Sequence, residues 1–395
     1  MLILATWPPP NVRLWSDRSL IMSNTAMTSA MHIGLHRPGF DFEYNRDPAL
    51  LNERSFQERS SAWVACYCLC ISLALESGHI PLVPANDWII NKVCMRPSQV
   101  YVPDEIRHFA IISKQANEAF QTLAQLNDNP AAVAQESSFF ATMSGLENAM
   151  VQMVTLHRHE MSLTNKLRSQ GTVLLLQMMY FLSDQHLESS KQGVLRAYAT
   201  ATILISDLIE EDDNDTFLAH APYNIMRVIL RASFTILRTL FSSHGKGLDL
   251  ASGKLLYNTS ALLLRHMAVK HRNQDQPIRV SNALKQTWKY SERTPELLEK
   301  PPLLKIRSRM AVSLQYDCLM FYRDAVRTAS DDVKRHDPQL GDGQLLTPAL
   351  ISSQVDTPGS NSLDSHWSPP SYEAFLATDL SWLDDLVEPS MYSAN

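Results

Sequence analysis

Residues 24–38 read Asn-Thr-Ala-Met-Thr-Ser-Ala-Met-His-Ile-Gly-Leu-His-Arg-Pro. This stretch predicts both a closely packed helix and the place where that helix ends. Ala26, Ala30 and Ile33 recur at spacings of four and three residues, with two methionines beside them. In a helix this spacing places small apolar side chains on one face. The stretch therefore predicts a helix over about residues 14–35 that packs closely against a neighbour.

The last five residues of the stretch predict where this helix stops. Gly34 suits the left-handed conformation that follows many helices, and Pro38 cannot continue a helix. We expect His36 and Arg37 to lie in the final turn, where the helix dipole favours positive charge. Gly34, Leu35, His36, Arg37 and Pro38 are therefore expected to have a structural role.

The composition favours an all-α protein. The 395 residues are 45% hydrophobic and 19% charged, as in ordinary soluble domains. Glycine is scarce, at 12 residues, and alternating runs of β-branched residues are missing from the sequence. The net charge of −6, from 35 basic and 41 acidic residues, argues against electrostatic nucleic-acid binding by the whole chain.

The cysteines and the apolar runs indicate a reducing compartment and no membrane partner. An odd, sparse set of five cysteines does not suggest a disulfide framework. Residues 1–10 lack the basic start of a signal peptide and are interrupted by prolines. The longest uncharged run, Ser60–Leu75, has 16 residues, whereas a spanning helix needs roughly 20. We therefore expect a buried core helix there.

Hydrophobic periodicity and helix stop signals predict an irregular multi-helix domain over residues 1–329. Residues 1–13 are expected to be extended. Gly78 is expected to end a helix and to be followed by extended chain at Ile80–Pro84. Gly145 is expected to mark a bend, and Gly171 is expected to separate two helices. We find no internal repeat. The expected helices cover about 14–35, 53–76, 88–95, 104–127, 131–168, 173–182, 190–210, 216–242, 249–272, 278–290 and 302–328.

The composition changes near residue 330. Residues 330–395 contain eleven acidic and two basic residues, a net charge of −9, so the other 329 residues carry +3. Residues 330–370 are rich in Ser, Pro, Gly and Asp, which predicts a disordered linker. Residues 371–395 then form an acidic C-terminal segment.

This acidic segment has the pattern of a short amphipathic helix over residues 371–388. Leucines recur at helical spacings, aromatic residues flank them, and every charged residue is acidic. Such a segment stays soluble through charge repulsion and offers apolar anchors to a partner's groove. The alternative is a C-terminal helix that docks on its own domain. The anchors are Phe375, Leu376, Leu380, Trp382, Leu383, Leu386 and Val387.

Cysteine and histidine spacings predict no metal site in this chain. Cys66, Cys68 and Cys70 lie two residues apart on an expected helix, so Cys68 points away from the other two. We interpret all three as buried core residues. His32 and His36 lack a third ligand, and residues 157–160 (His-Arg-His-Glu) are interpreted as a charged helix face.

The acidic run at residues 210–215 is the sequence's candidate for an enzyme's metal site. All-α terpene synthases bind magnesium through Asp-Asp-x-x-Asp, but after Asp212 and Asp213 the fifth position is Thr216. We interpret the run, which includes Asp215, as a solvated helix end. The sequence contains no nucleophile elbow, phosphate-binding glycine loop or dinucleotide fingerprint. We therefore expect no enzymatic activity.

Two groups of residues resemble the fungus-specific transcription-factor domain, the middle homology region of zinc-cluster (Zn2Cys6) regulators. Residues 34–37 match the family's Gly-Leu-His-Arg motif, and residues 60–61 are serines where a second basic residue is common. These motif residues are most similar to those of the subset that includes leucine-biosynthesis and weak-acid-response regulators. The second group, which resembles the family's next block, consists of Glu58, Arg59, Trp63, Gly78 and Pro81.

The resemblance implies a nuclear transcriptional regulator of a fungus. The family carries its zinc in an N-terminal six-cysteine cluster, which has no counterpart here, so we expect an N-terminally truncated regulatory domain with no cofactor of its own. DNA binding would then depend on an upstream cluster. The expected partners are the transcription machinery or a coactivator, through residues 371–388, and a small-molecule effector. The alternatives are a helical scaffold and a magnesium-dependent terpene-synthase-like enzyme.

Overall fold

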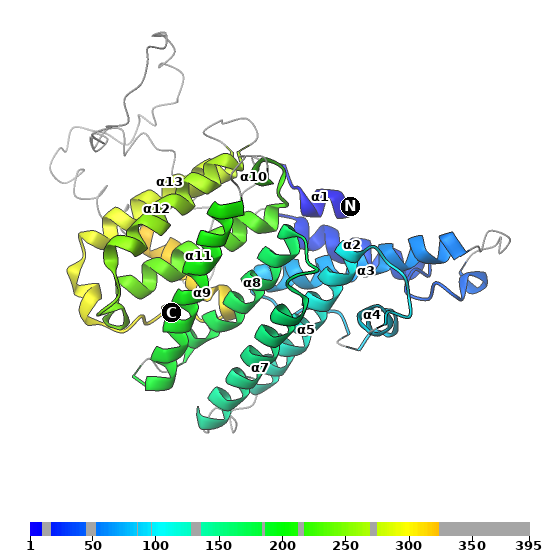
Figure 1. The fold of residues 1–395 in the computed structure, drawn as a ribbon, viewed down its shortest axis with the longest axis horizontal. Coiled ribbons are helices and arrows are strands. Elements are labelled where there is room, and N and C mark those ends of the chain that lie inside the picture. The colour runs from blue at the N-terminus through cyan, green and yellow to red at the C-terminus, as the bar shows by residue number, and fades with distance from the viewer. Residues whose placement is uncertain are drawn as a thin grey trace, which may run out of the picture. The chain divides into compact units, whose positions relative to one another are not determined.

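The computed structural model describes residues 1–9, 17–44, 53–84, 86–95, 97–127, 136–183, 186–211, 217–268 and 275–323. These residues form α-helices and short 3-10 helices with no strand among them, which confirms the predicted all-α class (Figure 1). The chain divides into a unit at Met1–Leu319 and a remainder at Met320–Asn395, and the description below concerns the first unit. The predicted linker at 330–370 and the acidic segment at 371–395 lie outside the described residues.

The α-helices follow one another along the chain with mostly short connections. They are α1 (Leu2–Thr6), α2 (Ser19–His32), α3 (Glu53–Glu76), α4 (Trp88–Cys94), α5 (Asp104–Asn127), α7 (Glu136–His157), α8 (Leu163–Gln177), α9 (Glu188–Glu211), α10 (Phe217–His220), α11 (Tyr223–Leu240), α12 (Leu250–His266) and α13 (Gln276–Glu292). The 3-10 helices include η1 (Asp41–Glu43), η3 (Met178–Leu182), η4 (Ser243–Gly245), η5 (Pro295–Glu299) and η6 (Met310–Val312).

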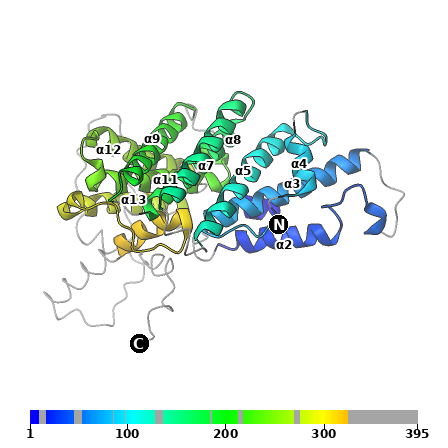
Figure 2. The same cartoon turned by 90° about the horizontal axis from the view of Figure 1, so that it is seen from below.

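Helices that are near in sequence pack side by side. α2 packs on α3, α3 on α5, α5 on α8, and α12 on α13, as the view in Figure 2 shows. α11 lies among α8, α9, α12 and α13. Its residues Ile225–Leu237 are all buried, including two arginines, so α11 is the central helix of the core.

Two glycines end helices as the sequence predicts. Gly34 has φ of 74°, and the next residue donates its N–H to the carbonyl of Ala30 at 2.9 Å. Gly78 has φ of 76°, with the equivalent bond to Ala74 at 2.9 Å. Both are Schellman turns, in which a residue without Cβ adopts the left-handed conformation. A Cβ on Gly78 would also lie 2.6 Å from the Arg309 carbonyl oxygen.

Several expected boundaries are wrong. Residues 1–13 are not extended throughout, because α1 occupies Leu2–Thr6. The long helix expected over 131–168 is interrupted by a turn at 158–162, where Ser162 caps α8 by accepting the Asn165 N–H at 3.3 Å. Gly145 marks no bend, since it lies inside α7.

Gly171 also has a role other than the expected one. It lies inside α8, and a Cβ there would be 2.7 Å from a methyl carbon of Val228 on α11. The glycine therefore permits a close approach of two helices.

Two further helix predictions differ from the structure because the backbone changes direction. The pattern at 216–242 is divided at Pro222, which separates α10 from α11. The pattern at 302–328 begins with non-helical chain, and the described part is helical from residue 313. Asp317 accepts the backbone N–H groups of Lys305 and Ile306, at 2.6 and 3.1 Å, which satisfies this non-helical stretch.

None of the described helices is both long enough and apolar enough to cross a lipid bilayer.

A buried carboxylate links four consecutive elements. Glu147 on α7 is 5% exposed and accepts hydrogen bonds at 2.9 Å from Gln177 of α8, from Tyr180 of η3, and twice from Arg196 of α9. Burial raises the pKa of Glu147, but these hydrogen bonds outweigh it and hold the pKa below its usual value. Glu147 is therefore an ionised hub of the fold.

Replacing Glu147 with glutamine should lower the free energy of unfolding at neutral pH by about 2 kcal/mol, since charged hydrogen bonds are lost. Because the folded-state pKa is depressed, this contribution is present above the unfolded-state pKa and disappears as pH falls through the folded-state pKa. Urea denaturation should therefore show a smaller difference at about pH 3.5 than at about pH 7. Glu118→Gln, which removes a half-exposed carboxylate, is the control and should have little effect. An equal loss at both pH values would contradict the assignment.

Candidate functional site

The residues of the Gly-Leu-His-Arg stretch meet the second group of predicted residues at the N-terminal half of α3. Arg59 donates an N–H to the carbonyl of Ile33 at 3.1 Å, which satisfies the end of α2. The His36 ring lies 5.7 Å from the ring of Trp63, and Trp63 donates its indole N–H to the carboxylate of Asp87 at 3.3 Å. These contacts join α2, α3 and the cap of α4.

The other predicted residues of this set are dispersed. Gly78 and Pro81 lie beyond the opposite end of α3; both are buried, as is Pro38. Leu35 is half-buried and Arg37 is exposed.

The expectation that His36 and Arg37 occupy the final turn of the helix is wrong. α2 ends at His32, and both residues follow Gly34 in the next turn, where His36 packs on Trp63 and Tyr44. Aromatic packing, rather than the helix dipole, positions the imidazole. Burial, with the nearby Arg37, lowers the pKa of His36, which keeps the ring neutral at pH 7.

The three cysteines of α3 are buried, as the sequence predicts. Cys66, Cys68 and Cys70 are each less than 5% exposed, and all are free thiols. Burial raises the pKa of Cys66 and of Cys70 to about 11, so these thiols stay protonated.

Two other predicted sets of residues lie outside the part of the chain that the structure describes. The aspartates of the acidic run, Asp212, Asp213 and Asp215, lie outside the described residues. The same holds for the anchors Phe375, Leu376, Leu380, Trp382, Leu383, Leu386 and Val387.

The interpretation of residues 157–160 as a charged helix face is wrong. His157 is the last residue of α7 and is buried, whereas Glu160 lies in the turn after it. The two side chains approach each other, with 3.8 Å between His157 Nδ1 and Glu160 Oε2.

A buried ionic cluster, which the sequence analysis did not identify, lies against the central helix. Arg227 of α11 donates to the carboxylate of Asp17, and its other terminal nitrogen is 3.8 Å from Oε2 of Glu76 at the end of α3. All three side chains are at most 6% exposed. The cluster thus joins the start of α2 and the end of α3 to α11.

A second arginine, one turn further along α11, lacks a comparable pairing. Arg231 is 2% exposed, and its Nε and Nη1 have no hydrogen-bond partner. Burial lowers its pKa to about 10, although Glu76 acts in the opposite direction, so it remains charged at neutral pH. Burial likewise raises the pKa of Glu76 by more than the nearby arginines lower it. Arg231 and Glu76 are therefore both incompletely satisfied.

These two groups line a cavity between α3, α5, α8 and α11. Its volume of about 30 Å³ is enough for roughly two water molecules. Arg168 of α8 also lines it, held 4.1 Å above the Phe109 ring and 3.6 Å from the carboxylate of Glu105. The remaining wall is mainly apolar and includes Gly171. The space is far smaller than the roughly 300–1,000 Å³ of ordinary ligand pockets, so it fits ordered water or a polar group of similar size.

One local signal could have identified this site. Arg227 and Arg231 are four residues apart in α11, so they share a helix face among Ile225–Leu240, which is otherwise largely apolar. A charged pair on a buried helix requires buried partners. The partners, Asp17 and Glu76, have no sequence signal.

The two arginines should respond differently to replacement. Arg227→Met leaves the buried Asp17 without its cation, takes one of two nearby arginines from Glu76, and should lower the free energy of unfolding by about 3–5 kcal/mol. Arg231→Met removes a guanidinium that has two unsatisfied nitrogens, so it should change the free energy of unfolding by less than about 1 kcal/mol. Urea denaturation of the two variants, matched in residue type and helix, measures this contrast. Equal losses would show that Arg231 is as well paired as Arg227.

Known proteins that this chain resembles in sequence are named as regulators or transcription factors. No family model matches the sequence, and no solved structure does. The chain is 23% identical over 366 residues to Regulatory protein LEU3 of Saccharomyces cerevisiae, covering 82% of this chain and 40% of that protein. It is 20% identical over 350 residues to Transcriptional regulatory protein SEF1 of Candida albicans, covering 86% of this chain and 38% of that protein.

A third relative is the Putative transcription factor SEF1 of Eremothecium gossypii, 20% identical over 240 residues, with coverage of 60% of this chain and 22% of that protein. The chain therefore matches two fifths or less of the length of these relatives. The relatives are named as regulators or transcription factors, and none of the names denotes an enzyme.

Proposed function

We propose that this chain is the regulatory region of a fungal transcriptional regulator that acts in the nucleus. The observation that carries the proposal is the similarity to two fungal regulators over 82% and 86% of the chain. The resemblance of residues 34–37, Arg59, Trp63 and Gly78 to the middle homology region supports the same class.

The two alternatives have less support. A helical scaffold outside transcription would not explain why the relatives carry the names of regulators. The terpene-synthase-like enzyme depends on Asp212, Asp213 and Asp215, which lie outside the described residues, and none of these relatives is named as such an enzyme.

Under this proposal, DNA recognition depends on a zinc cluster that is not among these 395 residues. The five cysteines are too few for a six-cysteine cluster, and three of them lie on α3. The negative net charge agrees with a region that contacts proteins and effectors rather than DNA. The acidic segment at 371–388 is the proposed contact with a coactivator.

A tethering assay tests the proposed role. The full chain, fused to a heterologous DNA-binding domain, should activate a reporter above the level of that domain alone. Replacing Leu380, Trp382 and Leu383 together with alanine should abolish activation, because the apolar anchors of the segment are lost. Thr378→Ala with Ser381→Ala is the matched control in the same segment and should retain activation. A silent reporter, for both the full chain and residues 330–395 alone, would contradict the proposal.

We further propose that the cavity beside Arg231 binds the effector of this regulator. Two unsatisfied Arg231 nitrogens offer donors for a carboxylate, and the unsatisfied Glu76 Oε2 offers an acceptor within the same cavity. A ligand that carries a carboxylate next to a hydroxyl or ammonium group would satisfy both. The volume limits the part of the ligand that enters to about the size of two water molecules, so the rest of the ligand would lie outside the cavity.

Ligand-dependent stabilisation tests this second proposal. Glycolate or glycine at millimolar concentration should raise the melting temperature of the wild-type chain, since a ligand of the folded state stabilises it by mass action. Arg231→Met should lose the shift. Lys246→Met, which removes one exposed positive charge elsewhere, should keep it. A shift of equal size in both variants would exclude Arg231 as the binding group.

A further inference from the structure

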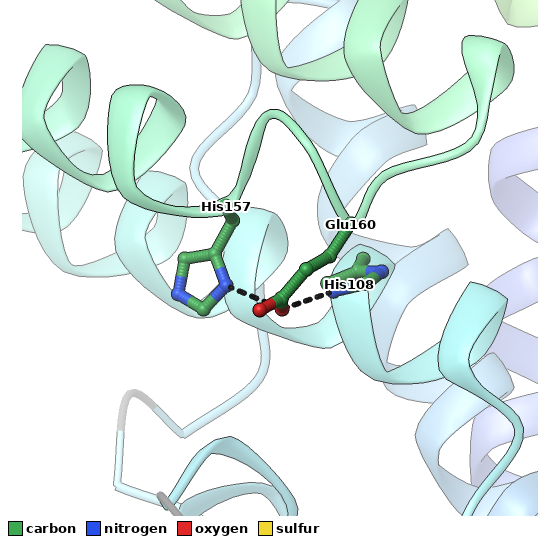
Figure 3. Close-up of side chains that lie close together, drawn as sticks. All are labelled: His108, His157 and Glu160. Atoms are coloured by element: carbon green, nitrogen blue, oxygen red, sulfur yellow. Dashed lines mark ion pairs between the residues drawn. The ribbon is translucent and has the colours of Figure 1, made fainter.

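Three potential metal ligands converge where α5 meets the turn between α7 and α8. His108 of α5 and His157 at the end of α7 are both buried, and Glu160 lies in the turn (Figure 3). Glu160 Oε2 is 3.6 Å from His108 Nε2 and 3.8 Å from His157 Nδ1. One ligand atom from each residue lies within 4.8 Å of the other two.

These distances are close to those of a zinc site. Two nitrogens and a carboxylate oxygen bound tetrahedrally at roughly 2.0–2.1 Å would lie roughly 3.4 Å from one another. The two distances to Glu160 therefore need only a small contraction, whereas the two ring nitrogens, which lie within 4.8 Å of each other, must approach by up to roughly 1.4 Å through side-chain rotation. The carboxylate of Glu160 is about half exposed, at 51%, so an ion can reach the site from solvent.

The backbone arrangement holds the ligands in place. The Glu160 N–H donates to the carbonyl of His157 at 3.0 Å, which closes the turn that brings the two side chains together. Asn165 of α8 donates to the backbone carbonyl of Glu105 at 2.9 Å, so α8 is fastened to the first turn of α5. His108 follows one turn later on α5. The site is thus built on fixed elements.

One positive group opposes metal binding. The terminal nitrogen Nη2 of Arg107 is 3.6 Å from Glu160 Oε2 and 3.2 Å from His108 Nε2. In the metal-free protein this guanidinium neutralises Glu160 and occupies the lone pair of His108. Arg107 also pairs with Asp104 at 3.2 Å. A bound ion must displace it from Glu160, and Asp104 provides the alternative partner.

We propose that His108, His157 and Glu160 bind a zinc ion, with water as the fourth ligand. Two neutral imidazoles and one carboxylate form a three-ligand set that zinc accepts. The bound ion would connect α5 to the α7–α8 turn, next to Phe109, which lines the interior cavity. The proposal concerns this chain's own side chains and is independent of the proposed function.

Metal titration of the full chain tests the site. After removal of metals with a chelator, the protein should bind one equivalent of Zn²⁺ in calorimetry, and Co²⁺ should give the visible absorption of a tetrahedral site with nitrogen and oxygen ligands. Glu160→Gln changes a half-exposed residue and should weaken binding at least about tenfold. His157→Gln should weaken it similarly.

Two variants make the test specific. His159→Ala removes an exposed imidazole beside the ligands and should leave the affinity unchanged. Arg107→Gln removes the competing cation and should tighten binding severalfold. The proposal is overturned if the wild-type chain takes up neither ion, if Glu160→Gln binds the first equivalent as tightly as wild type, or if Co²⁺ shows thiolate charge-transfer absorption.

Discussion

The paired charges around Arg227 constrain the core of this protein. α11 is enclosed by other helices, and an arginine placed there requires buried anions because an isolated interior charge is very costly. Asp17, before α2, and Glu76, at the end of α3, supply them. This requirement fixes two N-terminal elements to the central helix. It also determines the polarity of the cavity, because Glu76 is shared with Arg231, whose own nitrogens remain incompletely satisfied.

α3 connects the stretch that carries the family resemblance with this ionic cluster. Trp63 and Arg59 hold the turn after Gly34 near one end of the helix, and Glu76 is its last residue. The thirteen residue-to-residue steps from Trp63 to Glu76 span roughly 20 Å at the helical rise. A glycine in the left-handed conformation ends each of α2 and α3. Residues that carry the resemblance therefore pack on the N-terminal half of α3, and the C-terminal end of the same helix borders the cavity.

α5 links the cavity to the proposed metal site. Phe109 supports Arg168 in the cavity wall, and the preceding residue, His108, faces Glu160. Consecutive residues on a helix point in directions about 100° apart. One turn of α5 therefore borders both the cavity and the proposed metal site.

The sequence by itself determined the helical class, the bounds of α3 and α5, and the glycine exits after α2 and α3. These features depend on local periodicity and on glycine conformations that neighbouring residues specify. It did not reveal the break at 158–162, because a serine cap there competes with a helical pattern that continues on both sides. Only the tertiary structure brought Asp17 to Arg227, 210 positions away, and His108 to Glu160. Such pairings depend on how the helices pack, and no local sequence pattern specifies which two buried charged side chains will lie next to each other.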